Sequence, residues 1–338
     1  MGGLDAFEII RTSKKDQIIT METIIEPVSK ELIRVELTSD KLLRKTNKAN
    51  NEIYVITYHN APNTMMEIGR LREEAYRFSG GGTGQQIDID KFDTMAHCYK
   101  QLIVWNPEKE EIMGGYRYIN GKDVELDENG DPVISSSHLF KYSDLFMEDF
   151  LPYTIELGRS FVTVGYQSSI AGSKALFIMD NLWDGLGALI VKYPDMKYFF
   201  GKVTMYPNFG EKGRNMILYF LNKHFPDPER LVYPRHPLRT HMDLSSLSKL
   251  FVGGDFKENY KILNANVREL SRNIPPLVNA YMNLSPTMRV FGTCINDEFG
   301  DVEETGIMIN VGEIFEEKRD RHIATYIDQL KVKGVRLD

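Results

Sequence analysis

The sequence is poor in the features that mark secreted, membrane-spanning and metal-binding proteins. Its 338 residues include two cysteines, Cys98 and Cys294, whose spacing fits no metal-ligand pattern, so we expect reduced thiols in a cytoplasmic protein. No apolar run reaches the roughly 18 residues of a membrane span. The N-terminal stretch MGGLDAFEIIRTSKKD also lacks the apolar segment of a signal peptide.

Motifs for calcium and for nucleotide phosphates are also missing. The run from Asp88 to Asp93 resembles the start of a calcium loop, but Asp93 and Tyr99 occupy the positions that require glycine and glutamate. The glycine-rich stretch 79–84 follows no predicted strand and matches neither the P-loop nor the dinucleotide-binding pattern. It is either a loop over a pocket or a linker. We therefore predict no metal and no bound cofactor.

The charge balance argues against general binding to nucleic acid, because the net charge is −7. The charge is unevenly spread. Residues 192–239 contain nine basic and four acidic side chains, a net charge of +5, whereas residues 297–320 have a net charge of −7. The basic stretch could receive an acidic partner or anionic lipid head groups, or it could be an ordinary solvated surface.

The stretch 153–164 has the β-branched and aromatic residues of a central strand, but it also contains Glu156, Gly158 and Arg159. Regular alternation would direct Glu156 and Arg159 to opposite faces. A bulge at Gly158 would add one residue and turn both toward one face. A carboxylate, a guanidinium and unpaired N–H groups could then activate a nucleophile and stabilise an oxyanion. The alternative is an ion pair on a strand.

The predicted elements are ordered strand, helix, three strands, helix, strand, helix and a late hairpin. This order favours an α/β fold, with a mixed, mostly antiparallel sheet and helices on both faces. We predict an appended segment over residues 1–50 and a main domain over 51–312, which has a helical insertion at about 226–285 before its last hairpin. A C-terminal helix follows over 313–338. Within 1–50, residues 18–35 are predicted to be helical, and 41–51 to be a connector.

Two further arginines lie within apolar patterns. Arg72 lies on or beside the apolar stripe of a helix predicted over about 63–78, and Arg117 lies among apolar neighbours in a strand over 112–119. A charge in such a position needs a partner, so each arginine belongs either to a buried salt bridge or to a binding site.

Several of these segments together resemble one family. Ile155-Glu-Leu-Gly-Arg-Ser-Phe-Val162 is similar to the central strand of GNAT-like acyltransferases that make lipo-amino acids: ornithine-lipid N-acyltransferases, bacterial hemolysin-like proteins and Bacteroidetes glycine-lipid N-acyltransferases, the branch most resembled. Other matching segments contain Arg72, with Tyr76 in place of the usual phenylalanine, Asp90 to Asp93, Gly114 to Arg117, Leu182-Trp183, and Ile274 to Tyr281.

The resemblance implies attack of an amine on an acyl thioester. It makes Glu156 the candidate base, directly or through water, with Asp93 as the second candidate. Backbone N–H groups at the Gly158 bulge would hold the thioester oxygen, with Arg159 beside them. The other implied site residues are Arg72 or Arg117 for the acceptor carboxylate, Asp90 for substrate binding, and Tyr219 as a proton donor to the leaving thiolate, unless Tyr219 is only a packed helix residue.

The implied substrates are a fatty acyl group, including 3-hydroxyacyl, and a small amino acid, with glycine as the first candidate. Residues 165–174 lack the coenzyme A pyrophosphate loop of many GNAT enzymes, which favours acyl carrier protein as donor over coenzyme A. The acyl tail needs an apolar groove, for which Trp183, Phe199, Phe200 and Met205 are candidates. A peripheral contact with the inner membrane face is compatible with this chemistry. The alternatives are a coenzyme A-dependent small-amine acetyltransferase and a noncatalytic acyl- or membrane-binding protein.

Overall fold

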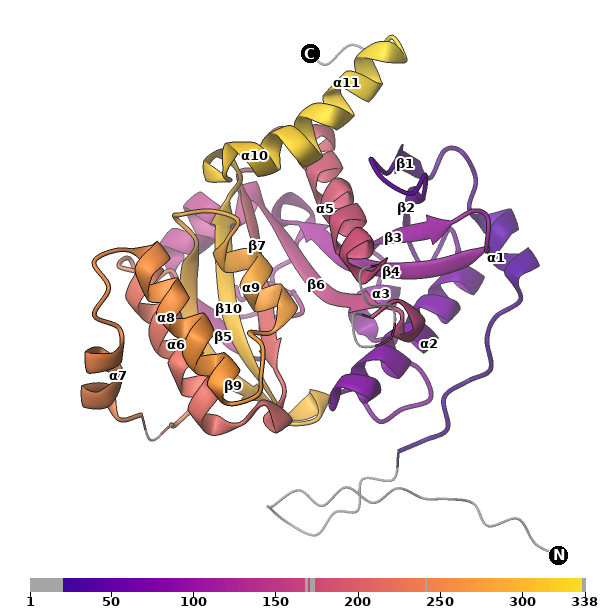
Figure 1. Cartoon of the computed structure of the whole chain (residues 1–338). Coiled ribbons are helices and arrows are strands. Elements are labelled where there is room, and N and C mark those ends of the chain that lie inside the picture. The colour runs from indigo at the N-terminus through magenta and orange to yellow at the C-terminus, as the bar shows by residue number, and fades with distance from the viewer. Residues whose placement is uncertain (1–20, 168–169, 171–173, 241, 336–338) are drawn as a thin grey trace, which may run out of the picture.

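The computed structural model describes residues 21–167, 170, 174–240 and 242–335 (Figure 1). In these residues, eight strands form one sheet in the order β1-β2-β3-β4-β6-β7-β10-β9. The strands are β1 (Leu42–Lys45), β2 (Glu52–Ile56), β3 (Lys100–Asn106), β4 (Glu111–Asn120), β6 (Thr154–Val162), β7 (Tyr198–Met205), β9 (Arg289–Asn296) and β10 (Val302–Asn310). The order and the mixed sheet confirm the α/β class predicted from the sequence.

One pair of neighbouring strands departs from the antiparallel pattern of the sheet. Strands β6 and β7 run parallel, and they pair only from Thr154 opposite Tyr198 to Glu156 opposite Phe200. Past that point, β6 continues to pair with β4, and β7 continues to pair with β10. The two halves of the sheet therefore separate and leave a wedge between β6 and β7.

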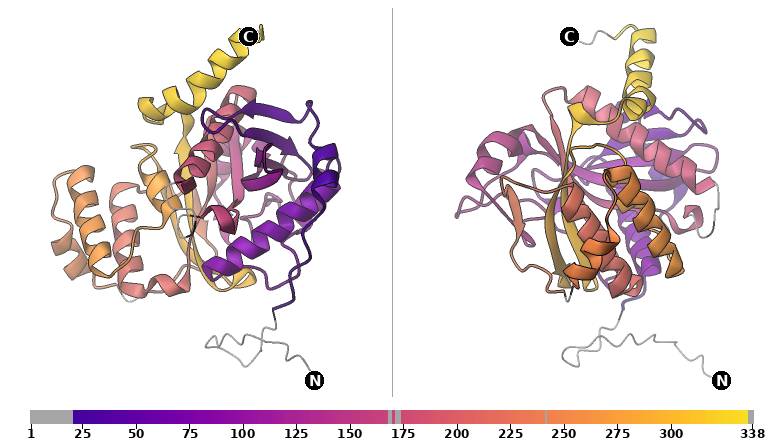
Figure 2. Two further views of the ribbon diagram at one scale, coloured as in Figure 1. Left: turned by 45° about the vertical axis from the view of Figure 1, so that its right-hand side comes forward. Right: turned by 60° about the vertical axis from the view of Figure 1, so that its left-hand side comes forward.

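Helices and an insertion cover both faces of the sheet (Figures 1 and 2). One face packs against α5 (Lys174–Lys192), α6 (Glu211–His224), α8 (Phe256–Glu269) and α9 (Pro276–Met282). The other face packs against α2 (Pro62–Ser79) and against the 121–153 segment, whose strand β5 (Phe140–Tyr142) pairs with β8 (Val232–Pro234). The other α-helices of the described residues are α1 (Lys30–Glu36), α3 (Lys91–Thr94), α7 (Leu244–Leu250), α10 (Glu316–Arg319) and α11 (Thr325–Val332).

The predicted bulge in β6 is present. Gly158 lies opposite Arg117 on β4 and Phe161 lies opposite Gly115, so two residues of β6 oppose one residue of β4. Arg159, the first of those two residues, has a φ of +46°. On β4, Gly114 makes room for the bulge, since a Cβ there would lie 2.6 Å from the carbonyl oxygen of Phe161.

The prediction for residues 18–51 was wrong in its details. Among the described residues of this segment, the helix is limited to Lys30–Glu36, and the expected connector contains the edge strand β1. That strand pairs with β2, and the Arg44 guanidinium donates to the carbonyl oxygen of His322 at 3.1 Å, which ties the edge of the sheet to the C-terminal helical segment. Polar composition suggested a connector because an edge strand needs apolar residues on one face only.

Candidate active site

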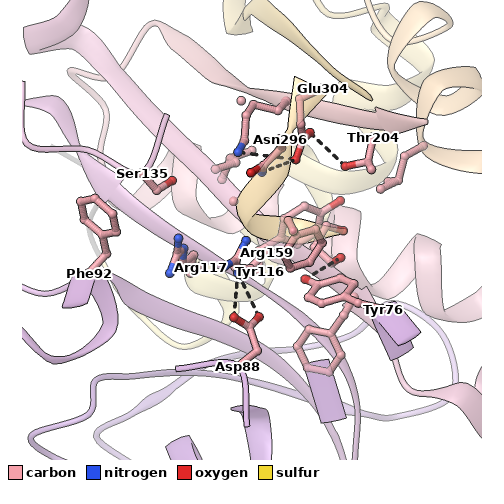
Figure 3. A pocket seen from close by; sticks show the side chains of 18 of the residues that line it. Tyr76, Asp88, Phe92, Tyr116, Arg117, Ser135, Arg159, Thr204, Asn296 and Glu304 are labelled. Carbon is pink, nitrogen blue, oxygen red and sulfur yellow. Dashed lines mark hydrogen bonds and ion pairs between the residues drawn. The ribbon is translucent and has the colours of Figure 1, made fainter. Parts of the chain in front are cut away.

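A cavity of about 1330 Å³ occupies the wedge between β6 and β7 (Figure 3). Its walls include Leu157 to Val162 of β6 and Phe199 to Lys202 and Thr204 of β7, and it reaches both faces of the sheet. On the α5 and α9 face its lining is mainly apolar, whereas on the α2 and α3 face it is rich in charged side chains. Such a volume exceeds the roughly 300–1,000 Å³ of common ligand sites, so it can take a long substrate.

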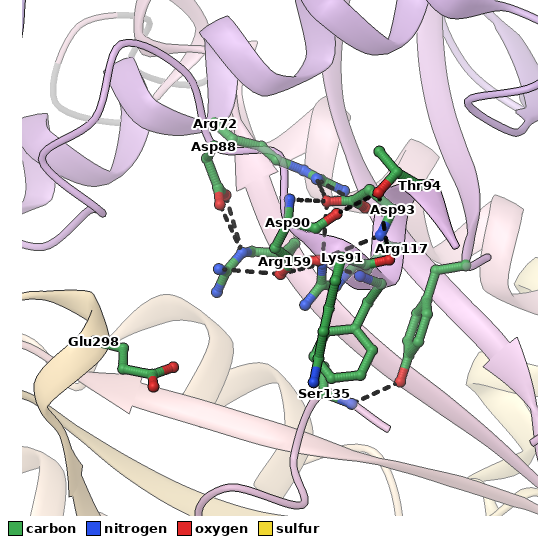
Figure 4. A network of polar contacts seen from close by, with 12 residues as sticks. Arg72, Asp88, Asp90, Lys91, Asp93, Thr94, Arg117, Ser135, Arg159 and Glu298 are labelled. Atoms are coloured by element: carbon green, nitrogen blue, oxygen red, sulfur yellow. Dashed lines mark hydrogen bonds and ion pairs between the residues drawn. The ribbon is translucent and has the colours of Figure 1, made fainter. Parts of the chain in front are cut away.

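Three arginines and three aspartates line or support the polar end (Figure 4). Arg117 Nη1 donates to both Asp90 carboxylate oxygens at 2.8 Å and to Asp93 at 3.2 Å. Arg159 Nε pairs with Asp88 Oδ2 at 2.9 Å. The set is completed by Arg72, which donates to Asp93 and to Gln101. This cluster, the Arg–Asp network, contains equal numbers of basic and acidic side chains.

Burial and the surrounding charges shift the pKa values of two of these aspartates in opposite directions. Burial alone would raise the pKa of Asp93, but the guanidinium groups of Arg72 and Arg117 outweigh it and hold that pKa well below its usual range. Burial raises the pKa of Asp88, opposed by Arg159. Asp93 is therefore a poor proton acceptor at neutral pH and acts as the anchor of two arginines.

The bulge gives Glu156 and Arg159 a common face, as predicted. Arg117 connects them, because its guanidinium lies 5.1 Å from the ring of Tyr99 and shares Asp90 with Arg159. The hydroxyl of Tyr99 in turn donates to Glu156. Burial, and next the Glu156 charge, raise the pKa of Tyr99 well above its ordinary value, so this hydroxyl keeps its proton.

Glu156 lies just behind the wall of the cavity. Its carboxylate accepts from the backbone N–H of Ser136 at 3.1 Å and from the Ser135 hydroxyl at 3.3 Å, and it is buried among these donors. Among the described residues, Ser135 lines the cavity and Glu156 does not. A proton from the cavity would therefore reach Glu156 through the Ser135 hydroxyl.

The structure separates the predicted residues into two groups. Arg117, Arg159, Asp90 and Gly158 line the cavity, together with Tyr76. Arg72 and Asp93 lie behind it, fully buried, where their side chains bond to each other, so the geometry gives no support to acceptor binding by Arg72 or to Asp93 as a base.

Tyr219 lies elsewhere, on α6. Its ring is stacked on Phe251, with 5.5 Å between the ring centroids, and it is not among the described residues that line the cavity. The structure therefore favours the packed-residue alternative over the proton donor. The expected apolar groove is partly confirmed, because Phe199 and Phe200 line the cavity, whereas Trp183 packs against Tyr281 and Met205 lies in the core.

Sequence reasoning missed the groups that surround Glu156 and the partner of Arg159. Tyr99 and Ser135 come from segments 57 and 21 residues away, and Asp88 was considered only as a calcium ligand. Strand alternation could have indicated Tyr99. Gln101 on β3 lies opposite Arg117 on β4 and shares its polar face, and Tyr99 is two residues before Gln101. Of the two alternatives for the 79–84 stretch, the structure favours a loop over a pocket, because Ser79 and Thr83 line the cavity.

None of the helices in the described residues has both the length and the apolar character needed to cross a bilayer. The cytoplasmic location and the membrane contact remain predictions, as do the domain limits. The described residues also contain no group of three His, Cys, Asp or Glu side chains placed to hold a metal ion.

The chain is similar to known acyltransferases over most of its length. Residues 71–174 match the family model of the acetyltransferase (GNAT) domain. The chain is 65% identical over 308 residues to a glycine N(alpha)-acyltransferase of Bacteroides thetaiotaomicron, covering 91% of each protein. It is 62% identical over 309 residues to one of Phocaeicola vulgatus, covering 91% of this chain and 95% of that protein.

The chain also matches the solved structure of the CoA-dependent acyl-homoserine lactone synthase BjaI with SAM and isopentyl-CoA. The match covers 80% of this chain and 86% of the synthase. Its TM-score is 0.36 at 9% identity, which is too low to support a functional argument. The assignment therefore rests on the two bacterial relatives and on the domain match. At such identity over nearly the whole of both sequences, the chain belongs to the glycine N(alpha)-acyltransferase family and is a GNAT-type N-acyltransferase.

Proposed function

We propose that the chain transfers a fatty acyl group, including 3-hydroxyacyl, from the thioester of acyl carrier protein to the amine of glycine, a step of amino-acid lipid synthesis. The cavity between β6 and β7 carries this proposal, because it joins an apolar end to a charged end through the sheet. The apolar end accommodates the acyl chain, and the charged end accommodates a small zwitterion. The names of the two bacterial relatives support glycine as the acceptor.

The thioester carbon is placed at the β6 bulge, where the two ends meet. Among the described residues, those of β6 that follow Glu156 have no pairing partner on β7. Backbone N–H groups on that edge are available to a thioester oxygen as negative charge develops on it. The Arg159 guanidinium lines the same part of the cavity and favours the same charge.

The reaction requires the acceptor nitrogen to lose two protons. An ammonium group must lose one proton before its nitrogen can attack the thioester carbon. The C–N bond then forms, nitrogen loses a second proton, and the C–S bond breaks to release a thiolate that takes one proton from solvent. One proton is released overall. We assign the second proton to Glu156, reached through the Ser135 hydroxyl.

The size of the apolar end should set the preferred acyl length. Leu277 of α9 lines it, so Leu277→Trp should exclude the distal part of the chain. Each excluded methylene should lower kcat/KM for long donors by about fourfold, from about 0.8 kcal/mol per buried methylene. A series of acyl donors of increasing length measures this. Leu244→Trp, at an exposed leucine of α7, is the control, and an unchanged length profile for Leu277→Trp would contradict the placement of the acyl chain.

The choice of donor depends on the charge around the cavity. Part of the 165–174 segment, where a pyrophosphate loop would lie, falls outside the described residues. In the basic stretch 192–239, Lys202 and Arg235 line the cavity, and Arg235 is paired with Asp131 at 2.9 Å. Other basic side chains of this stretch, such as Lys212 and Arg230, are exposed, which supports an acidic carrier protein and would also suit the phosphates of coenzyme A.

A direct comparison of donors tests this choice. With the same long acyl group on both carriers, we expect a higher kcat/KM for acyl carrier protein than for coenzyme A, because docking of the acidic protein adds binding energy. The steady-state formation of N-acylglycine is the measurement. Turnover that is equal or better with acyl-coenzyme A would overturn the carrier-protein proposal and leave the acyltransferase assignment intact.

Neither alternative function is retained. A noncatalytic binding protein is excluded because the chain is an acyltransferase. A small-amine acetyltransferase would leave the apolar end of the cavity unused, since an acetyl group does not extend past the bulge.

A further inference from the structure

We infer that Glu304 of β10, with Lys202 of β7 beside it, forms the subsite that receives the acceptor as a zwitterion, and that Glu304 takes the first proton from its ammonium group. This inference rests on the proposed function, because it concerns the acceptor of the same reaction. Both residues line the cavity, and Glu304 lies across it from Asp88, Arg117 and Arg159 of the Arg–Asp network (Figure 3). Neither belongs to the segments that carry the family resemblance.

The Glu304 carboxylate is held firmly but keeps capacity for a ligand. Thr204 Oγ1 donates to its Oε2 at 3.0 Å, and Asn296 Nδ2 lies 3.4 Å from its Oε1. Lys202 Nζ is 3.6 Å from Oε1, an ion pair that is too long for a hydrogen bond. The Glu304 side chain is 4% exposed, so its charge is poorly screened by solvent. Each carboxylate oxygen can accept a second hydrogen bond.

A second observation points to a ligand with N–H donors. Asn296 is buried at 2% exposure and lines the cavity, and its Oδ1 makes no well-formed hydrogen bond to a described residue, although the His138 ring approaches the Asn296 side chain. An unpaired buried acceptor is costly unless a ligand or water satisfies it. An ammonium group has three N–H donors, which suits Asn296 Oδ1 together with the two oxygens of Glu304.

The Lys202 charge supplies the complementary half of the subsite. A free amino acid carries an ammonium and a carboxylate one carbon apart, and the side-by-side Glu304 and Lys202 charges match that pair. His138 also lines the cavity, but burial, and next Lys202, lower its pKa, so it is neutral and does not compete for the carboxylate. The guanidiniums of Arg117 and Arg159 are already hydrogen-bonded to carboxylates, whereas the contact of Lys202 Nζ with Glu304 is an ion pair longer than a hydrogen bond.

The assignment divides the two nitrogen protons between two carboxylates. Glu304 accepts the first as the ammonium becomes a neutral amine, whose lone pair then forms the C–N bond. The second goes to Glu156 through Ser135, as described above. Glu304 therefore acts before attack and contacts the acceptor, whereas Glu156 acts after attack and stays behind the cavity wall.

Two acceptors and three variants test the subsite. Glycine and glycinamide both offer an amine, but only glycine offers a carboxylate. Glu304→Gln should raise the KM for both acceptors by about 10- to 100-fold, the usual range for losing a charged hydrogen-bond partner. Lys202→Met should raise the KM for glycine and leave that for glycinamide unchanged. Glu303→Gln is the matched control, because Glu303 pairs with Arg214 and does not line the cavity within the described residues, and it should leave both KM values unchanged.

The possible outcomes distinguish this inference from the proposed function. If the wild-type protein acylates glycine and Glu304→Gln leaves the glycine KM unchanged, the subsite is wrong and the proposed function stands. If Glu304→Gln does not fold, Lys202→Met decides, since an equal effect on both acceptors would refute the zwitterion subsite. If the wild-type protein neither binds nor acylates glycine, the proposed function and the subsite both fail.

Discussion

Glu156→Gln should lower kcat by about 10²- to 10⁴-fold, the usual contribution of general acid–base catalysis. Glutamine preserves the size of the side chain and can still accept from Ser135 and Ser136, but it cannot take a proton. Binding of the acyl donor should barely change, because the donor has no proton for this group to accept. Single-turnover formation of N-acylglycine at saturating substrates measures the chemical step.

The proposed proton route through the Ser135 hydroxyl can be tested with a second variant and a control. Ser135→Ala removes the hydroxyl that connects the cavity to Glu156, and it should also lower kcat, though less if a water takes its place. Ser143→Ala makes the same change in the same 121–153 segment, where the Ser143 hydroxyl accepts from the backbone N–H of Phe146 and does not line the cavity within the described residues, and it should leave kcat unchanged. A folded Glu156→Gln protein with near-normal turnover would reject Glu156 as the base and leave Glu304 as the remaining candidate.

Asp93→Asn should destabilise the folded protein by about 3–5 kcal/mol, the cost of removing one member of a buried ion pair. The substitution keeps the shape of the side chain but leaves Arg72 and Arg117 without the charge that both contact at 3.2 Å. Urea unfolding followed by circular dichroism gives the free energy. Asp195→Asn, which breaks the exposed pair with Lys122, is the control and should have no measurable effect.

The stability difference should depend on pH in a definite direction. Because the Asp93 pKa is depressed in the folded state, its contribution is complete above the unfolded value of about 3.9 and is lost as pH falls toward the folded value. The gap between wild type and Asp93→Asn should therefore be constant near neutral pH and shrink in acid. A gap that widens in acid, or a loss below about 1 kcal/mol at neutral pH, would show that the pair is not a buried anchor.

The sequence by itself determined the order of the main elements after residue 51 and the departure from regularity in β6. Strand alternation and helical periodicity depend on neighbouring residues, so they can be read locally. The spacing of Glu156, Gly158 and Arg159 conflicts with alternation in a strand that otherwise fits it, and the bulge resolves this conflict. Local pattern also showed that Arg72 and Arg117 need partners.

Only the tertiary structure decided which of these charges reach the substrate cavity. Arg159 meets Asp88 across 71 residues of sequence, and Glu156 meets Tyr99 across 57, so no local pattern could place them together. The cavity itself arises where β6 and β7 separate, and pairing between strands that are distant in sequence sets that point. Packing therefore buried Arg72 and Asp93 behind the wall and brought Lys202 and Glu304 to its surface.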